Sequence, residues 1–279
     1  MCGVLPIASS TYYDTKVRPP SARQLRDQEL EKEIKRVYGE NYFVYGVYKI
    51  YRQLKREGIK VAKCTVARLM LKMGIVGEKR GKTKKTTLPA TGTQRPQDLV
   101  NRDFKPLAPN RLWVADITYV RTFLGFVYVA FIVDAFSRMI IGWQVSNTLR
   151  SDLALDALEM AIWGRRRDNL DHLVHHSDAG VQFLSIRYTD RLEEAGISIS
   201  VGSKGDAYDN ALAETVNGLY KTEVVRKRGL FKNQEEVEFA TLGWVDWFNN
   251  RRLLGPIGYI PPVEYEELYY RERVKDDVA

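Results

Sequence analysis

The chain has 279 residues, of which 44% are hydrophobic and 11% aromatic, a composition typical of a globular protein with one large or two modest domains and not of a disordered chain. Its longest apolar run, Phe126 to Val133, is far too short to cross a bilayer, and the amino terminus lacks the basic start and apolar stretch of a secretory signal, so a membrane or secreted protein is disfavoured. Two distant cysteines without a CxxC pattern fit a reducing compartment and argue against a disulfide scaffold or a cysteine zinc site.

The formal net charge of +8 is unevenly distributed along the chain. Residues 1–112 contain 24 Lys and Arg against 10 Asp and Glu, a net charge of +14, whereas residues 113–279 contain 19 against 25, a net charge of −6. A basic first half is typical of a protein that contacts a polyphosphate, and equally of a solvated, lysine-rich helical surface. The acidity of the second half needs a different explanation.

The first segment, about 22–76, is helical by pattern, and we assign residues 1–77 to a small helical module. Two apolar stripes with helical spacing indicate two short helices, and they are formed by Val47, Ile50, Tyr51 and Leu54 and by Val66, Leu69, Met70 and Met73. Gly58 and Gly74 are expected to end these helices. The pattern predicts a helix-turn-helix, although any αα-hairpin shows it. The residues of the second helix expected to contact DNA are Lys63, Arg68 and Lys72.

Residues 78–107 are interpreted as a basic linker. Their first part, EKRGKTKKTTLPATGTQRPQ, has no periodicity and is rich in Lys, Thr, Gly and Pro. Such a stretch is either simply soluble or, through Lys82, Lys84 and Lys85, follows phosphates between two DNA-binding parts of the protein.

From residue 108 onward the pattern changes to alternating strands and helices. The candidate strands LWVADITYV, FVYVAFIV and MIIGWQV come first, followed by a helix from Ser151, its expected cap, to Arg166. Then follow a strand at HLVHHS, a helix at SIRYTDRLEEAG, a strand at ISISV and two further helices, the last with a capping box from Asn233 to Glu236. This order predicts an α/β fold with a mixed five-stranded sheet covered by helices.

The helix predicted within GDAYDNALAETVNGLYKTE, residues 205–223, carries an unusual polar stripe. If Asp206 caps it, then Asn210, Glu214, Asn217 and Lys221 lie on one face, opposite an apolar face. The stripe has a single carboxylate flanked by two amides and a lysine.

Each of three carboxylates has an ordinary structural interpretation when taken alone, but together they suggest a catalytic metal site. Asp116 interrupts an apolar strand, Asp178 follows the HLVHHS strand, and Glu214 lies on the following helix. An unpaired buried carboxylate is costly, and carboxylates that converge at one sheet edge repel each other unless a hard cation lies between them. Mg²⁺ takes oxygen ligands, and two such ions about 3.5–4 Å apart support phosphodiester chemistry.

These residues also carry a resemblance to a known family. WVADITYV with Asp116, HHSDAGVQF with Asp178, and Glu214 after 35 intervening residues resemble the DDE integrase core of bacterial insertion-sequence transposases, and most closely the OrfB product of the family named after insertion sequence three. The resemblance covers nearly the whole chain, because YGVYKIYRQLKREGIKV is similar to that family's helix-turn-helix and FNNRRLLGPIGYIPPVEYE to its tail. Lys221, seven residues after Glu214, strengthens the resemblance.

The resemblance implies a fold, an activity and partners. The core, residues 108–279, would have a ribonuclease-H-like fold, and Asp116, Asp178 and Glu214 would be catalytic ligands of two Mg²⁺ or Mn²⁺ ions. The activity would be DNA cleavage at element ends followed by strand transfer. The partners would be double-stranded DNA, both terminal inverted repeats and target, a second copy of the chain, and an upstream-frame product acting with it or fused to it. The protein would be cytoplasmic and associated with the bacterial nucleoid.

On this interpretation Asn210, Asn217 and Lys221 contact phosphates or bases of the DNA end, and a second acidic side chain there would repel DNA. Lys221 could otherwise be a solvated lysine. Two other functions stay open: a DNA-binding regulator with a decayed catalytic core, which would tolerate loss of any of the three carboxylates, and a ribonuclease-H-type nuclease, which would cut without joining.

Other candidate groups are assigned structural roles. His172, His175 and His176 lie close together, but strand alternation puts the last two on opposite faces, so a zinc site is not expected. Asp134 is expected to shape a strand turn. The five tryptophans are expected in the core, and they are Trp113, Trp143, Trp163, Trp244 and Trp247.

Overall fold

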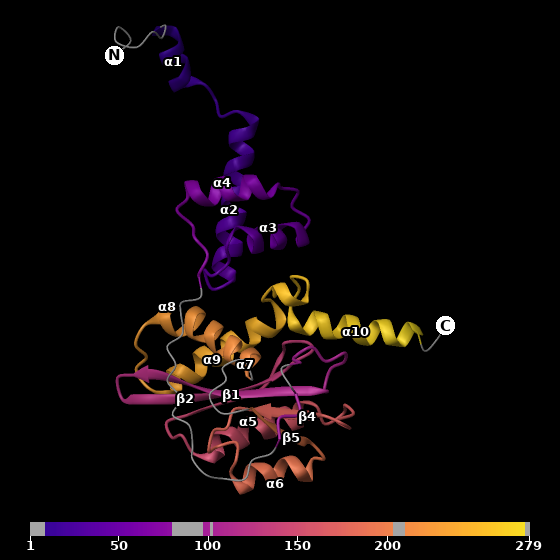
Figure 1. Ribbon diagram of the computed structural model, residues 1–279. Coiled ribbons are helices and arrows are strands. Elements are labelled where there is room, and N and C mark those ends of the chain that lie inside the picture. The colour runs from indigo at the N-terminus through magenta and orange to yellow at the C-terminus, as the bar shows by residue number, and fades with distance from the viewer. Residues whose placement is uncertain (1–8, 80–96, 101–102, 203–209, 277–279) are drawn as a thin grey trace. The chain divides into compact units, whose positions relative to one another are not determined.

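The computed structural model describes residues 9–79, 97–100, 103–202 and 210–276 (Figure 1). The chain divides into two compact units, Met1–Gly77 and Glu78–Ala279. Lys82, Lys84 and Lys85, which were expected to follow DNA phosphates, lie outside the described residues. Among the helices that the structure describes, none is both long enough and apolar enough to span a membrane.

The first unit is entirely helical. Its helices are α1 (Ser9–Val17), α2 (Ala22–Glu40), α3 (Val47–Arg56) and α4 (Lys63–Lys72). Gly58 and Gly74 have φ values of +81° and +67°, so both adopt the left-handed conformation that ends a helix, as expected. The small core is formed where the three longer helices meet, and its fully buried members are Ile34, Val37, Tyr45, Ile50, Leu54, Val66, Leu69 and Met70.

The second unit is built on a mixed five-stranded sheet, which confirms the predicted fold class. The strands are β1 (Leu112–Thr122), β2 (Gly125–Asp134), β3 (Ile140–Ser146), β4 (Val174–Ser177) and β5 (Ser198–Val201), in the order β3-β2-β1-β4-β5. The first three pair antiparallel, as expected for strands joined by tight turns, and β4 and β5 add in parallel beside β1.

Helices cover both faces of the sheet (Figure 1). One face packs against α5 (Ser151–Gly164) and α6 (Ile186–Glu194). α5 lies so close to β3 that a Cβ on Gly142 would stand 2.1 Å from the Ala157 carbonyl oxygen, so only glycine fits there.

The other face packs against α7 (Ala211–Tyr220) and α9 (Gln234–Asn250), with an aromatic cluster in between. The rings of Phe131, Tyr220 and Trp244 contact one another edge to face, with centroids 5.2–5.9 Å apart. Smaller elements complete the unit: a π-helical turn η1 (Lys221–Val225), α8 (Arg226–Arg228), a 3₁₀ turn η2 (Gly255–Ile257) and α10 (Pro262–Asp276).

The caps of three helices differ from the prediction in whole or in part. α5 has Arg150 rather than Ser151 as its N-cap residue, without a side-chain cap. α7 begins at Ala211 with Asn210 as its N-cap residue, and Asp206, the expected cap, lies outside the described residues. In α9 the Asn233 side chain accepts the Glu236 backbone N–H at 3.0 Å as predicted, but the Glu236 carboxylate accepts the N–H of Lys232 instead of completing the box.

The prediction that all five tryptophans are core residues is wrong for Trp163. Its side chain is 68% exposed and stacks against the Arg166 guanidinium, 4.3 Å from the ring centre. This residue is near the end of α5 on its solvent side, so the apolar ring contacts a cation rather than the core. Trp113, Trp244 and Trp247 are fully buried, and Trp143 is half-buried.

Candidate active site

The register of two parallel strands brings Asp116 and Asp178 together. Ala115 of β1 pairs with Ser177 of β4, and this is the last pair between the two strands. Asp116 is the next residue along β1, and Asp178 follows β4 directly. Both carboxylates therefore lie where β4 stops and β1 continues with only β2 paired beside it.

Asp116 is held in place by two hydrogen bonds. Its Oδ1 accepts the backbone N–H of Ile117 at 2.8 Å, and its Oδ2 accepts the side-chain amide of Asn217 from α7 at 2.8 Å. Its pKa is raised to about 8, mainly by burial, then by the charge of Asp178 and less by that of Glu214, and the two hydrogen bonds oppose the rise. A buried carboxylate with a raised pKa is stabilised either by binding a proton or by a cation placed beside it.

Asp178 has the same kind of environment in a milder form. Burial raises its pKa, while the Gly180 backbone N–H, which donates to its Oδ1 at 3.1 Å, and the nearby His176 lower it. The Oδ1 atom would also lie 2.9 Å from a Cβ placed on Gly180, so a glycine leaves room for the carboxylate to face back over its own loop.

Glu214 lies in the first turn of α7 and its side chain is exposed. It is close enough for its charge to raise the pKa of Asp116, but it contributes less to this rise than Asp178 does. Within the described ranges, no group of three or more His, Cys, Asp or Glu side chains is close enough to hold a metal ion. The structure thus brings two of the predicted ligands together and places the third within electrostatic reach of them.

Asn210 and Asn217, both predicted to contact DNA, are buried at 6% and 7% exposure and join α7 to β1. Asn210 donates to the Ala115 carbonyl oxygen at 2.9 Å, and Asn217 donates to Asp116. In the part of the chain that the structure describes, neither side-chain Oδ1 atom has a hydrogen-bond partner. The two amides therefore set the distance between α7 and the Asp116 strand, and their DNA contacts stay a prediction.

Lys221 lies at the end of α7, two helical turns after Glu214. Its Nζ is 4.3 Å from the ring centre of Tyr119, a residue that sequence reasoning missed although it is three positions after Asp116 on the same strand. Burial lowers the pKa of Lys221, and the negative charge of Asp116 opposes this. Lys221 is therefore within electrostatic reach of Asp116, and its predicted contact with DNA stays a prediction.

The histidines and Asp134 have structural partners. His175 contacts the Tyr188 hydroxyl through Nε2 at 2.9 Å, and His176 contacts the Ser200 hydroxyl through Nδ1 at 2.8 Å, so the two rings lie on opposite faces as expected. The fully buried Asp134 carboxylate accepts backbone N–H groups of Asn110, Phe136 and Ser137 at 2.7–3.0 Å, which makes it the organiser of the turn after β2.

The basic residues of α4 are only partly available for DNA. Arg68 donates to the Asp27 carboxylate at 2.8 and 3.0 Å, and Lys72 pairs with Glu31 at 2.7 Å, so two of the three predicted contacts form ion pairs with α2. Lys63 is exposed at the first position of α4, with its Nζ 5.9 Å from the Tyr48 ring centre. The DNA contacts of all three stay predictions.

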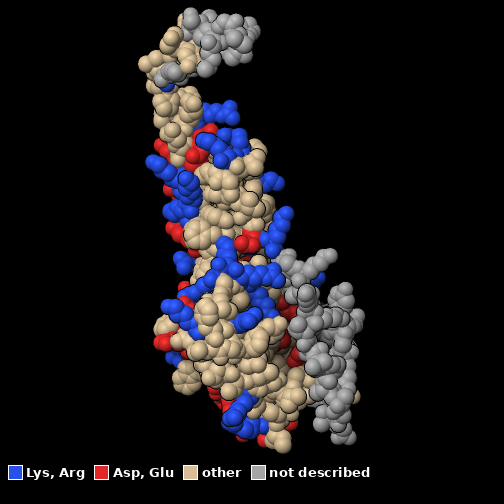
Figure 2. All heavy atoms as spheres, turned by 90° about the vertical axis from the view of Figure 1, so that its left-hand side faces the viewer, with Lys and Arg blue, Asp and Glu red and all other residues tan. Residues whose placement is uncertain are grey.

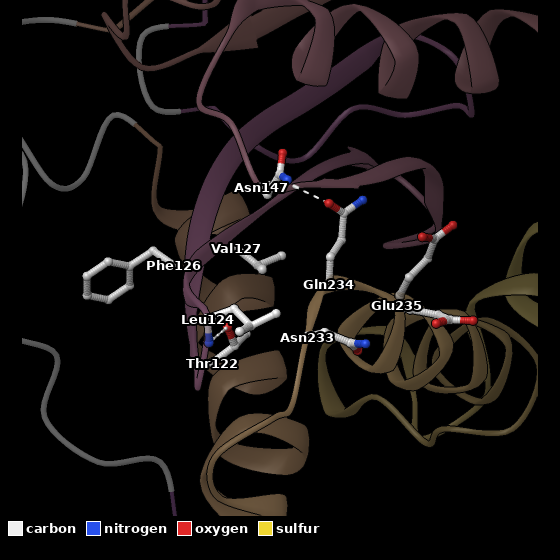
Figure 3. Close-up of a pocket in the computed structure, with 9 residues that line it drawn as sticks. Thr122, Leu124, Phe126, Val127, Asn147, Asn233, Gln234 and Glu235 are labelled. Carbon is white, nitrogen blue, oxygen red and sulfur yellow. Dashed lines mark hydrogen bonds between the residues drawn. The ribbon is translucent and has the colours of Figure 1, made fainter.

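A pocket of about 370 Å³ has none of the three candidate ligands in its lining, and Figure 3 shows the residues that line it. It is lined by the far end of β1, the start of β2 and the first turn of α9, where the Gln234 side chain accepts the Asn147 backbone N–H at 3.1 Å. Its acidic members, Glu235 and Glu238, are exposed.

Comparisons with known proteins identify both units. The Integrase core domain family matches residues 106–207 and again 195–262, and the HTH-like domain family matches residues 24–83. A putative transposase for insertion sequence element IS986/IS6110 from Mycobacterium tuberculosis is 54% identical over 272 residues, which cover 96% of this chain and 98% of the relative. The chain belongs to the insertion-sequence transposases.

Further relatives agree with this assignment. The transposase for IS629 from Shigella sonnei is 53% identical, covering 100% of this chain and 94% of the relative. The HTLV-2 integrase catalytic core domain is 20% identical over 58% of this chain with a TM-score of 0.45, a likeness too weak to support an inference about function. The matches favour a transposase with a polynucleotidyl-transferase core over the decayed regulator and the simple nuclease.

Proposed function

We propose that this transposase cleaves DNA at the ends of its insertion sequence and joins them to target DNA with Asp116, Asp178 and Glu214 as ligands for Mg²⁺, or Mn²⁺ in its place. The observation that carries the proposal is the end of the β1–β4 pairing, after which Asp116 and Asp178 follow side by side with their pKa values raised by burial. Such a pair is best stabilised at neutral pH by a hard cation.

The residues present fit divalent cations of this type. The donors are carboxylate oxygens without a cysteine or a histidine among them, which is the set that Mg²⁺ and Mn²⁺ prefer. Glu214 would complete the set from the first turn of α7, since its charge already acts on Asp116. When bound, such ions supply charge stabilisation for an in-line displacement at phosphorus.

The remaining side chains orient the carboxylates and hold the DNA end. Asn217 donates to Oδ2 of Asp116 and so leaves Oδ1 directed by the Ile117 N–H, which fixes the carboxylate plane. Lys221 contributes a positive charge beside the site for a phosphate of the DNA backbone. Beyond it Arg226, Lys227 and Arg228 of α8 are exposed, and Figure 2 shows basic side chains gathered on this face of the unit.

The helical unit would bind the terminal inverted repeats. α3 and α4 form the two helices of the motif, and exposed Lys63 at the start of α4 is at the position from which recognition helices contact DNA. Two DNA ends must be held together for joining, so we infer a homo-oligomer. An upstream-frame product would act with it or be fused to it.

The proposal is tested by strand joining on an oligonucleotide that carries an element end. Wild type is expected to join in the presence of Mg²⁺ or Mn²⁺ and to lose joining when the ion is chelated. Glu214→Gln keeps the size of the exposed side chain and is expected to bind the end but not to join it. Joining that survives this substitution would reject the assignment of Glu214.

A further inference from the structure

The helix that carries Glu214 does not continue as a regular α-helix. At Lys221 it widens into the π-helical turn η1, in which the N–H of Arg226 donates to the carbonyl oxygen of Lys221, five residues back. The Thr222 hydroxyl donates to the Gly218 carbonyl oxygen at 2.7 Å and so competes with the normal helical pattern. A π turn holds more residues than an α turn, and single π turns within helices are frequent at functional sites.

A buried ion pair holds this turn against α9. The Glu223 carboxylate accepts from Nε of Arg252 at 3.1 and 3.2 Å, contacts its Nη2, and accepts from Nε1 of Trp244 at 3.1 Å. Both charged side chains are only 5% exposed. Trp244 lies within α9 and Arg252 follows its end, so two side chains from this stretch hold a single carboxylate of the π turn.

The energetics of the Glu223–Arg252 pair indicate that its main effect is to position the π turn and not to stabilise the fold. Removing two charges from water costs several kcal/mol per ion, and well-packed apolar residues of similar volume often stabilise a fold as well or better. An ion pair with three directed hydrogen bonds tolerates fewer arrangements than an apolar contact does. The turn is therefore held in one register relative to α9.

Lys221 is the first residue of that turn. It lies seven residues after Glu214, which puts both side chains on one face of the helix, and its Nζ contacts the Tyr119 ring close to Asp116. If the turn relaxed to a regular α-helix, the residues from Thr222 onward would rotate about the helix axis, and Thr222, Glu223 and Val224 could not all stay buried.

We propose that Glu223 and Arg252 are positioning residues that hold the π turn and thereby keep the Lys221 ammonium over Tyr119, beside the carboxylate site. This inference rests on the proposed function only where it says that Lys221 contacts the DNA end. The placement of Lys221 itself can be measured without DNA or metal ions.

The test variant is Glu223→Gln with Arg252→Met in the full chain. It removes both charges together, and the glutamine keeps an acceptor for Trp244, so no charge is left buried and unpaired. The matched control is Glu266→Gln with Arg165→Met. That ion pair is similarly buried, with 8% and 10% of the two side chains exposed, but it joins the end of α5 to α10. Both variants are first checked for folding by circular dichroism and denaturant unfolding.

The main readout is the rate at which a soluble acylating reagent modifies Lys221, which is measured by mass spectrometry. We expect this rate to rise about threefold in the test variant, because that is the effect of losing one cation–π contact. In the control the rate is expected to stay at the wild-type value. An unchanged rate in the folded test variant overturns the inference. If the double variant does not fold, Arg252→Lys is used, which keeps the charge but loses the two-nitrogen contact with Glu223. This variant is also expected to raise the modification rate of Lys221. An unchanged rate in it overturns the inference as well.

Strand joining gives the second readout. The test variant is expected to join DNA ends about tenfold to a hundredfold more slowly per folded molecule, because a small misplacement near the reacting atoms has effects of that size, whereas the control joins like wild type. Equal joining by the test variant and wild type contradicts the positioning role. Failure of wild type to join would instead contradict the proposed function, and the Lys221 modification rates would still decide the placement.

Discussion

The side-chain amide of Asn217 donates to Oδ2 of Asp116 at 2.8 Å, which ties the helix that carries Glu214 to the strand that carries Asp116. Replacing Asn217 with Leu removes the donor at similar volume. We expect Mn²⁺ affinity to fall about tenfold to a hundredfold, the usual cost of losing a group that orients a metal ligand. Isothermal titration with Mn²⁺ measures this.

The control for Asn217 is Asn210→Leu. Asn210 also joins α7 to β1, but through the Ala115 carbonyl oxygen and not through a carboxylate. Its loss is expected to lower the free energy of unfolding by about 1–3 kcal/mol while Mn²⁺ affinity per folded molecule stays near the wild-type value. Equal losses of affinity in the two variants would show that helix placement alone accounts for the effect of Asn217.

Divalent ions should stabilise the folded protein through the carboxylate pair. At a concentration 100 times the dissociation constant, Mn²⁺ is expected to raise the free energy of unfolding of wild type by about 2.7 kcal/mol. Asp116→Asn should abolish this increase, and Glu238→Gln, an exposed carboxylate in the pocket of Figure 3, should preserve it. Denaturant unfolding with and without Mn²⁺ measures the difference, and stabilisation that persists in Asp116→Asn would place the ion elsewhere.

The buried His175 predicts an acid-sensitive fold. Burial lowers its pKa to about 3, against an ordinary value of 6.5. Between these values the unfolded chain binds a proton that the folded chain does not, so stability falls as the pH falls through this window. From pH 6.5 to pH 5 the contribution is about 1.5 kcal/mol. We expect His175→Asn to lose this part of the pH dependence and His172→Asn, at an exposed position, to keep it, as measured by urea unfolding at both pH values.

The ion pairs between α2 and α4 make a prediction about DNA binding. Lys63→Gln is expected to weaken binding and to lower the slope of log affinity against log salt by about 1, the effect of losing one phosphate contact. Glu31→Gln releases Lys72 from its ion pair and should strengthen binding and steepen the slope by up to about 0.9. Fluorescence anisotropy of a labelled element end at several salt concentrations measures both. Weaker binding in Glu31→Gln would mean that the Lys72–Glu31 pair orders the DNA-binding surface.

Much of the architecture could be predicted from the sequence because periodicity and turn residues are local signals. The five strands, the helices between them and the glycine helix ends are examples. The neighbouring positions of Asp116 and Asp178 could also be inferred, since each directly follows the segment in which β1 and β4 pair. The structure leaves the shared metal site of the three carboxylates as a prediction.

The rest depended on tertiary partners that no local pattern contains. A helical face shows that Arg68 and Lys72 are polar, but not that Asp27 and Glu31 of α2 face them. Asn210 and Asn217 occupy the predicted stripe of α7, and burial against β1 gives them a role that spacing alone could not indicate. The π turn, with its Glu223–Arg252 pair, arises from contacts with α9 and has no counterpart in the sequence pattern.

The most direct test of the account is a crystal structure of this transposase grown with Mn²⁺, with data collected at a wavelength where manganese scatters anomalously. The account predicts anomalous density between the carboxylates of Asp116 and Asp178, with Glu214 turned toward it. The protein used must join DNA ends in Mn²⁺. If its crystals show manganese bound elsewhere, or no manganese beside these two carboxylates, the account is contradicted.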